Sequence, residues 1–305
     1  MWLLILPIDA PRHQSGIGLR APLTYHWPLE SGAMEGRESM EAQLLQRFAG
    51  LDRLYGWGTM ARLSRASVCV VGVGGVGSWV VEALARSAVG RIRMIDADDV
   101  CISNVNRQLP ALDGNFGRSK VALLSERAIA INPHLRVEAI EQFLTPANQD
   151  ALIGDEFDVV IDACDAFRVK VELIAWCRRR KQRIVVIGSA GGRIDPTLIR
   201  VRDLSRTEHD AMLALIRKKL RADFGFPRGD KRYFSVPAVY SLENVRYPQA
   251  DGSVCGLRPA DDGAAGKLDC GGGLGAATHV TAAFGMVAVS RCLALLLEPA
   301  PGVAT

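Results

Sequence analysis

The sequence predicts an α/β fold: a doubly wound, Rossmann-like, mostly parallel sheet continued by short antiparallel strands. Three observations support this prediction: strand-length apolar runs without polar alternation, helix-length segments between them, and a glycine-rich turn after the first run. Strands that are apolar throughout are buried on both faces, which is typical of a parallel sheet covered by helices.

The strand-length runs lie in the first two thirds of the chain, at 67–71, 91–96, 136–140, 157–162 and 184–187. Between them the pattern predicts helices, most clearly over 78–87 and over 120–131, where Asn132-Pro133 ends the helix. Residues 41–66 have helical spacing, with a break at Gly56-Trp57-Gly58.

The pattern changes after Gly191. We expect short antiparallel strands at 198–201 and 239–245, with a basic helix and loop between them at 213–232. No linker divides the chain, so the sequence predicts one folded domain over residues 41–298. Residues 1–40 are expected to form a disordered extension, and 299–305 a flexible tail.

Composition narrows the class of protein. The chain has 305 residues, 49% hydrophobic and 23% charged, with a net charge of +4, which permits an anionic partner without requiring one. Its seven cysteines include no C-x-x-C pair, which argues against a disulfide framework and favours a reducing cytoplasm. The apolar segment 276–297 contains Thr278, His279 and Arg291, so we expect a buried core helix and no membrane insertion.

The turn Gly72-Val73-Gly74-Gly75-Val76-Gly77 follows a strand and opens a helix, the setting in which G-x-G-x-x-G binds a nucleotide. Its helix N-terminus offers amide donors to a phosphate. Asp96 ends the next strand, where a carboxylate accepts hydrogen bonds from ribose hydroxyls. These features fit an NAD-binding module and an ATP-binding enzyme equally well.

The segment after the second strand favours ATP. It runs from Asp98 to Gln108 and places an arginine among several amides, and Lys120 begins the next helix. A pyrophosphate in an NAD site is held chiefly by backbone amides, whereas a triphosphate calls for arginine and lysine donors.

Together the glycine loop, Asp96 with Asp98, and Ser103-Asn104-Val105-Asn106-Arg107-Gln108 resemble the ThiF/MoeB superfamily, kin to ubiquitin-activating enzymes. The resemblance implies that the domain predicted over residues 41–298 is a ThiF-like adenylating domain that uses ATP and Mg²⁺. It implies catalytic roles for Arg107, Lys120 and Asp165, with Asp165 binding magnesium. It further implies that ATP is bound by Gly72, Gly74, Gly75, Gly77, Asp96, Asp98, Asn104, Asn106, Arg107, Gln108 and Lys120.

Two departures from the superfamily pattern matter. Sulfur-carrier activators have paired C-x-x-C zinc ligands, but here only the isolated Cys255 and Cys270 occur, so no zinc is expected. In the superfamily, the second arginine of an N-terminal Arg-x-x-Arg reaches the partner subunit's ATP. Here that motif reads Arg47-Phe48-Ala49-Gly50, and Arg53 is a candidate replacement.

A zinc-free subfamily, the tRNA threonylcarbamoyladenosine dehydratases (TcdA or CsdL), resembles the chain more closely. The similarity includes the segments 53–56, 98–101, 191–197, 247–252 and 275–278. It implies adenylation of the threonylcarbamoyl carboxylate in the tRNA anticodon loop, followed by intramolecular ring closure with loss of water. The alternative left open is adenylation of the C-terminus of a ubiquitin-like sulfur carrier.

The resemblance also implies a homodimer and allows a partner from a cysteine desulfurase system. A basic run with interleaved aromatic residues fits the tRNA substrate, because phosphates and unstacked bases bind those residue types. Its members are Arg217, Lys218, Lys219, Arg221, Phe224, Phe226, Arg228, Lys231, Arg232, Tyr233 and Phe234. A solvated helix face is the alternative interpretation of this run. Cys255 and Cys270 lie in the loop-rich second half and are candidates to carry a transient acyl or sulfur group, with a small buried apolar residue as the alternative interpretation of each.

Overall fold

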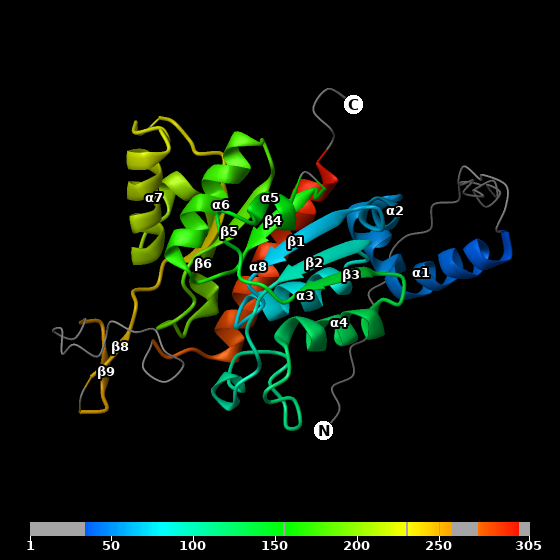
Figure 1. The fold of residues 1–305 in the computed structure, drawn as a ribbon, viewed down its shortest axis with the longest axis horizontal. Helices are drawn as coiled ribbons and strands as arrows, with labels where there is room; N and C mark the ends of the chain where they lie inside the picture. Colours follow the sequence, from blue (N-terminus) through cyan, green and yellow to red (C-terminus); the bar gives the residue numbers. More distant parts are fainter. Residues whose placement is uncertain (1–33, 155, 230, 250, 258–273, 299–305) are drawn as a thin grey trace, which may run out of the picture.

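The computed structural model describes residues 34–154, 156–229, 231–249, 251–257 and 274–298. A central sheet separates two layers of helices (Figure 1). Its strands are β1 Ser67–Val71, β2 Arg91–Ile95, β3 Arg136–Ile140, β4 Val159–Asp162, β5 Ile184–Ile187, β6 Ile199–Asp203 and β7 Pro237–Ser241. The helices are α1 Met34–Tyr55, α2 Thr59–Leu63, α3 Gly77–Ala85, α4 Lys120–Ile131, α5 Gln149–Leu152, α6 Phe167–Arg179, α7 Ala211–Asp223 and α8 Thr278–Leu297.

The strand order is β3-β2-β1-β4-β5-β7-β6. Every neighbouring pair is parallel except β6 with β7, so the predicted doubly wound, mostly parallel sheet is confirmed. The last four residues of β1 are buried, in agreement with a strand covered on both faces.

The two faces of the sheet have separate apolar cores. Helices α3, α4 and α8 pack on one face, with Leu84, Leu124 and Phe284 at the centre of that core. Helices α6 and α7 cover the other face through residues such as Trp176 and Leu213. The positions of α3 and α8 matter most for function, because both helices begin beside the glycine loop.

Helix α8 is long and apolar enough to cross a membrane, the one such helix among the residues that the structure describes. In the fold, 56% of its most apolar window is buried. Phe284, Ala288 and Cys292 are fully buried in the core that α8 shares with α3. The helix therefore occupies the predicted core position.

Several predicted boundaries were wrong. Helix α1 begins at Met34, inside the segment expected to be a disordered extension; residues 1–33 and the tail 299–305 lie outside the described residues. Strand β7 spans 237–241, where 239–245 was predicted, and it pairs in parallel with β5 as well as antiparallel with β6. Strand direction depends on the crossover through α7, which the spacing of apolar residues does not reveal.

The sequence pattern gave no bounds for α5 and α6, which lie in two of the helix-length intervals between predicted strands. The short hairpin that joins β8 Tyr247–Pro248 to β9 Val254–Cys255 was not predicted. This hairpin lies at the opposite end of the molecule from α1 (Figure 1). Two-residue strands carry too few residues for an alternating pattern to be recognised.

Candidate functional site

The glycine loop lies where the order of the strands reverses. It follows β1, whose neighbours are β2 on one side and β4 on the other. Asp96 follows β2, and the segment Ala163-Cys164-Asp165 follows β4. Ligands of open α/β sheets bind in the crevice at this kind of position. The chain thus gathers three predicted site segments at one edge of the sheet.

Packing requires glycine at Gly72 and Gly77. Gly72 has φ +81°, and a Cβ there would lie 2.8 Å from the backbone of Cys164. A Cβ on Gly77 would lie 1.9 Å from the carbonyl oxygen of Gly72. Gly74 and Gly75 are less confined, since an added Cβ would meet nothing closer than 3.7 and 3.6 Å.

Asp96 fastens the glycine loop to β2. Its Oδ2 accepts a hydrogen bond from Val73 N at 2.7 Å, and its Oδ1 accepts one from Asp98 N at 2.9 Å. Each carboxylate oxygen can accept a further hydrogen bond, which leaves capacity for ribose hydroxyls.

Lys120 and Asp98 form an ion pair across the crevice wall. Lys120 Nζ lies 2.8 Å from Asp98 Oδ2, and the lysine side chain is only 6% exposed while that of Asp98 is 54% exposed. The pairing is extended by the hydrogen bond from Lys120 N to Asp98 O. The ammonium group is therefore held in place at the start of α4 before any ligand binds.

Asn104 and Asn106 have structural contacts in this segment. Asn104 is buried, and its Oδ1 accepts from Cys101 N at 3.0 Å, which closes the 3₁₀ turn Ile102–Asn104. Asn106 Nδ2 donates to Ala276 O, and Asn106 O accepts from Thr278 Oγ1. The hydrogen bonds of both residues stabilise the 3₁₀ turn. Their contact with ATP stays a prediction.

Arg107 lies beside Gly75. A Cβ on Gly75 would be 3.6 Å from its side chain, and the guanidinium donates to Ser103 O and Asn106 Oδ1. Its carbonyl accepts from Trp79 Nε1 at 3.2 Å, so α3 fixes the backbone that carries the arginine.

Gln108 is buried near Gly74, with its Nε2 3.7 Å from an added Cβ. Its Oε1 has no hydrogen-bond partner within the described part of the chain. A buried acceptor of this kind normally has a partner, and the contact of this oxygen with ATP stays a prediction.

The segment after β4 contains two aspartates in different surroundings. Asp162 is fully buried and pairs with Lys170, whose Nζ lies 2.9 Å from Asp162 Oδ1. Asp165 is exposed beyond the strand end. One free carboxylate fits Mg²⁺, which usually takes one or two carboxylates and substrate phosphates. The described residues contain no cluster of three or more metal-ligating side chains.

The structure gives the isolated cysteines no catalytic assignment. Cys255 is partly buried on β9, with Sγ 3.7 Å from Leu257 O, and Cys270 lies outside the described residues. Burial and the adjacent Asp162 raise the pKa of the Cys164 thiol well above its usual value, so this group stays protonated near neutral pH.

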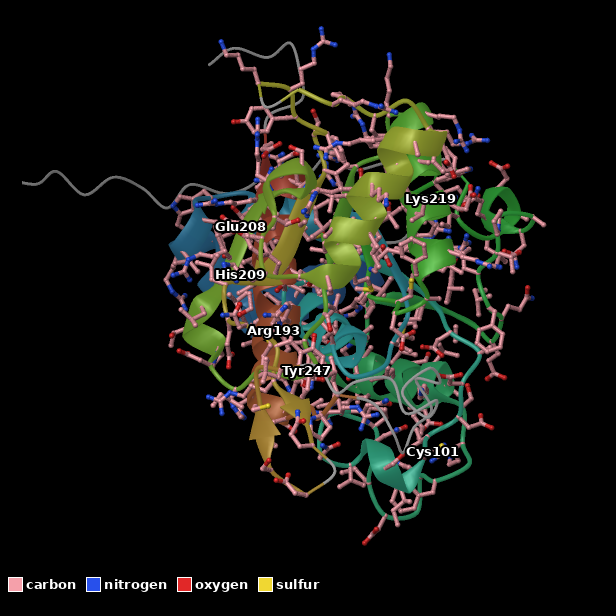
Figure 2. All side chains as sticks on the ribbon, turned by 90° about the vertical axis from the view of Figure 1, so that its left-hand side faces the viewer. Cys101, Arg193, Glu208, His209, Lys219 and Tyr247 are labelled. Atoms are coloured by element: carbon pink, nitrogen blue, oxygen red, sulfur yellow. The ribbon has the colours of Figure 1, made fainter. Side chains whose placement is uncertain are left out.

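Two buried cations were not predicted as functional residues. Lys170 lies on α6, a helix whose bounds the sequence pattern did not give. Arg193 is fully buried and donates to the carbonyls of Ser189, His209 and Glu243, joining the loops after β5 and β7 to the segment before α7. Figure 2 shows Arg193 between His209 and Tyr247. For Lys170 the available signal was a basic residue between Val169 and Val171, whereas Arg193 follows two glycines and carries no such signal.

Only some side chains of the basic run are exposed on the surface of the protein. Phe226 and Phe234 are buried against each other with ring centroids 4.9 Å apart, so the interpretation of both as stacking platforms was wrong. Arg221 lies 5.3 Å from the centroid of the Phe234 ring and belongs to this packing. Lys218 and Lys219 are exposed on α7, and Figure 2 shows Lys219 far from Cys101, which precedes the 3₁₀ turn.

Comparisons with known proteins identify the family of this chain. The sequence profile of the ThiF family matches residues 43–301. The chain is 46% identical to a tRNA threonylcarbamoyladenosine dehydratase of Haemophilus influenzae over 253 residues, 83% of this chain and 94% of that protein. It is 46% identical to the Escherichia coli protein of the same name over 255 residues, covering 84% and 95% of the two chains.

A solved structure extends the similarity to the fold. The Escherichia coli tRNA N6-threonylcarbamoyladenosine dehydratase in complex with ATP superposes with a TM-score of 0.73 at 43% identity, covering 83% of this chain and 94% of that one. The relatives are thus similar along nearly their whole length, and one of them binds ATP.

Proposed function

This chain belongs to the ThiF family, and on that basis we propose that it is an ATP-dependent tRNA threonylcarbamoyladenosine dehydratase. The observation that carries the proposal is the 46% identity to two bacterial relatives of that name across at least 94% of their length. The arrangement of the glycine loop, Asp96, Arg107 and Lys120 supports ATP as the co-substrate.

The first chemical step activates a carboxylate. The threonylcarbamoyl carboxylate oxygen attacks the α-phosphorus of ATP, and the bond from that phosphorus to the bridging oxygen breaks, releasing pyrophosphate. The acyl group now carries AMP as its leaving group in place of oxide. Arg107 and Lys120 would stabilise the charge that develops on the phosphate oxygens, the usual means of catalysis in phosphoryl chemistry.

The second step closes the ring. The neighbouring carbamoyl group attacks the activated acyl carbon, AMP leaves, and one proton is lost, so the nucleoside loses one water overall. Both groups belong to one molecule, and this proximity makes an enzyme nucleophile unnecessary. That conclusion agrees with the protonated state of Cys164.

We assign roles to the remaining site residues by position. Asp96 would accept hydrogen bonds from the ribose, and Gln108 would use its unpaired Oε1 on the nucleotide. Asp165 would hold Mg²⁺, which supplies charge neutralisation at the phosphates when it is bound. Amides of the glycine loop and the α3 N-terminus would bind phosphate oxygens.

The test is nucleoside analysis of tRNA that carries threonylcarbamoyladenosine, after incubation with this protein and ATP. We expect the modified adenosine to lose 18 mass units, the mass of one water, only when ATP is present. An unchanged nucleoside would refute the proposal. Adenylation of a sulfur-carrier protein in the same assay would favour the alternative activity, whereas an NAD-binding module would release no pyrophosphate from ATP.

We further propose that exposed cations around α7 contact the tRNA. Because Arg221 packs on Phe234, its reversal would disturb the fold, so the informative substitutions are Lys218→Glu, Lys219→Glu and Lys231→Glu. The triple variant should bind tRNA at least about tenfold more weakly. Its affinity should also depend less on salt concentration, because a protein that contacts fewer phosphates releases fewer counterions when it binds.

ATP affinity is the internal control in that experiment. It should stay unchanged, since α7 is remote from the 3₁₀ turn in Figure 2. Unaltered tRNA affinity in filter-binding titrations over a range of salt concentrations would reject this surface as the tRNA contact.

We propose a homodimer in which Arg53 reaches the partner's nucleotide. Arg47 Nη1 donates to Ile131 O at the end of α4 and is thus engaged within its own chain. Arg53 is exposed near the end of α1. A cytoplasmic location and a partner from a cysteine desulfurase system stay predictions.

A further inference from the structure

A buried ion pair lies directly beneath the segment that carries Asp165. Both partners, Asp162 and Lys170, have fully buried side chains. Lys170 Nζ also donates to the main-chain carbonyl of Asp162 at 3.2 Å. One ammonium group thus holds both the side chain and the backbone of the last residue of β4.

The pair is not explained by stability alone, because buried ion pairs are often no better than apolar residues of similar volume. Asp162 Oδ2 is buried with no hydrogen-bond partner among the described residues. Compensation for burying this carboxylate therefore comes from Lys170 and from Cys164, whose N and Sγ donate to Oδ1 at 3.3 and 3.0 Å.

The residues after Asp162 are in contact with the glycine loop. Ala163 N donates to Val71 O at 2.9 Å, and the backbone of Cys164 fills the space beside Gly72 that a Cβ would occupy. If the end of β4 were displaced, the backbone of Cys164 that packs against Gly72 would move with it. Asp165, which directly follows Cys164, would move as well.

We propose that Lys170 is a positioning residue for adenylation: by holding Asp162, it sets the position of Asp165 relative to the phosphates that the glycine loop binds. This inference rests on the proposed function, in which Asp165 holds Mg²⁺. Lys170 itself is fully buried and acts only through Asp162 and the segment Ala163-Cys164.

The test measures ATP affinity by calorimetry, once with Mg²⁺ and once with EDTA. Lys170→Met alone would leave an unpaired buried carboxylate and risks unfolding the protein. The variant Lys170→Met with Asp162→Asn avoids this, because the asparagine Oδ1 still accepts from Cys164. In this double variant we expect the Mg²⁺-dependent gain in ATP affinity to fall by about tenfold, with the EDTA value unchanged.

A matched control removes a partly buried ion pair away from the glycine loop, whose two side chains are each 16% exposed. Arg93 and Glu138 pair between β2 and β3 at 2.7 Å, and Arg93→Met with Glu138→Gln should leave both affinities unchanged. An unchanged Mg²⁺ effect in the Lys170/Asp162 variant would overturn the inference and leave the proposed function standing. The absence of any Mg²⁺ effect in the wild type would overturn the inference together with the assignment of Mg²⁺ to Asp165, while tRNA nucleoside analysis would still decide the dehydratase function.

Discussion

Replacing Lys120 with alanine should reduce the rate of tRNA dehydration by about 10²- to 10³-fold, the usual effect of removing one donor that stabilises developing charge. The ammonium is fixed 2.8 Å from Asp98 and shielded from water, so its charge acts in an environment of low dielectric constant. Alanine removes that charge and leaves only the half-exposed carboxylate of Asp98, which water can solvate. Single-turnover kinetics with modified tRNA measures the effect.

The matched control lies two residues earlier. Arg118 forms an exposed ion pair with Glu126 at 2.7 Å, and exposed pairs of this kind contribute little. Arg118→Ala should therefore retain the wild-type rate, and circular dichroism should show both variants folded. A Lys120→Ala enzyme with full activity would exclude the proposed catalytic role of this lysine.

Gly77→Ala should destabilise the protein by about 3 kcal/mol, because the added methyl group has no space. Its Cβ would lie 1.9 Å from the carbonyl oxygen of Gly72, which is backbone and cannot rotate away. For a chain of this size such a loss lowers the melting temperature by about 6–12 °C. ATP binding should be lost as well, since relief of the clash must open the loop that contacts the phosphates.

Gly75→Ala is the control within the same loop. The nearest atoms to its added Cβ lie at 3.6 Å, an ordinary van der Waals distance, so the melting temperature should stay within about 2 °C of wild type. Differential scanning calorimetry on the two variants separates these expectations. Equal melting temperatures would show that the tight approach of Gly77 to Gly72 is not a constraint on the fold.

The sequence was sufficient to predict which segments meet at the carboxyl ends of the central strands, because these segments are close together in the chain. Strand β1, the glycine loop and the start of α3 are consecutive in the chain, and the carboxyl ends of parallel strands share one edge of the sheet. Asp96, Arg107 and Lys120 are close to these elements in sequence, so motif spacing was enough to group them.

Contacts between distant segments could not be read in the same way. The fastening of Asn106 to Ala276 joins residues 170 positions apart, and the buried aromatic pair Phe226–Phe234 looked like a surface feature in the linear pattern. Burial of an aromatic ring depends on which element covers it, and that is a property of the assembled core.

The sequence by itself determined the fold class, the nucleotide loop and the ThiF resemblance, since each of these depends on local periodicity and on motifs with fixed spacing. Only the tertiary structure decided the direction of β7, the inward packing of Arg221 and the pairing of Lys170 with Asp162. These features depend on which surfaces come into contact when the two layers of helices pack on the sheet. The partner of a buried charge is set by this packing, and the linear order of residues does not specify that partner.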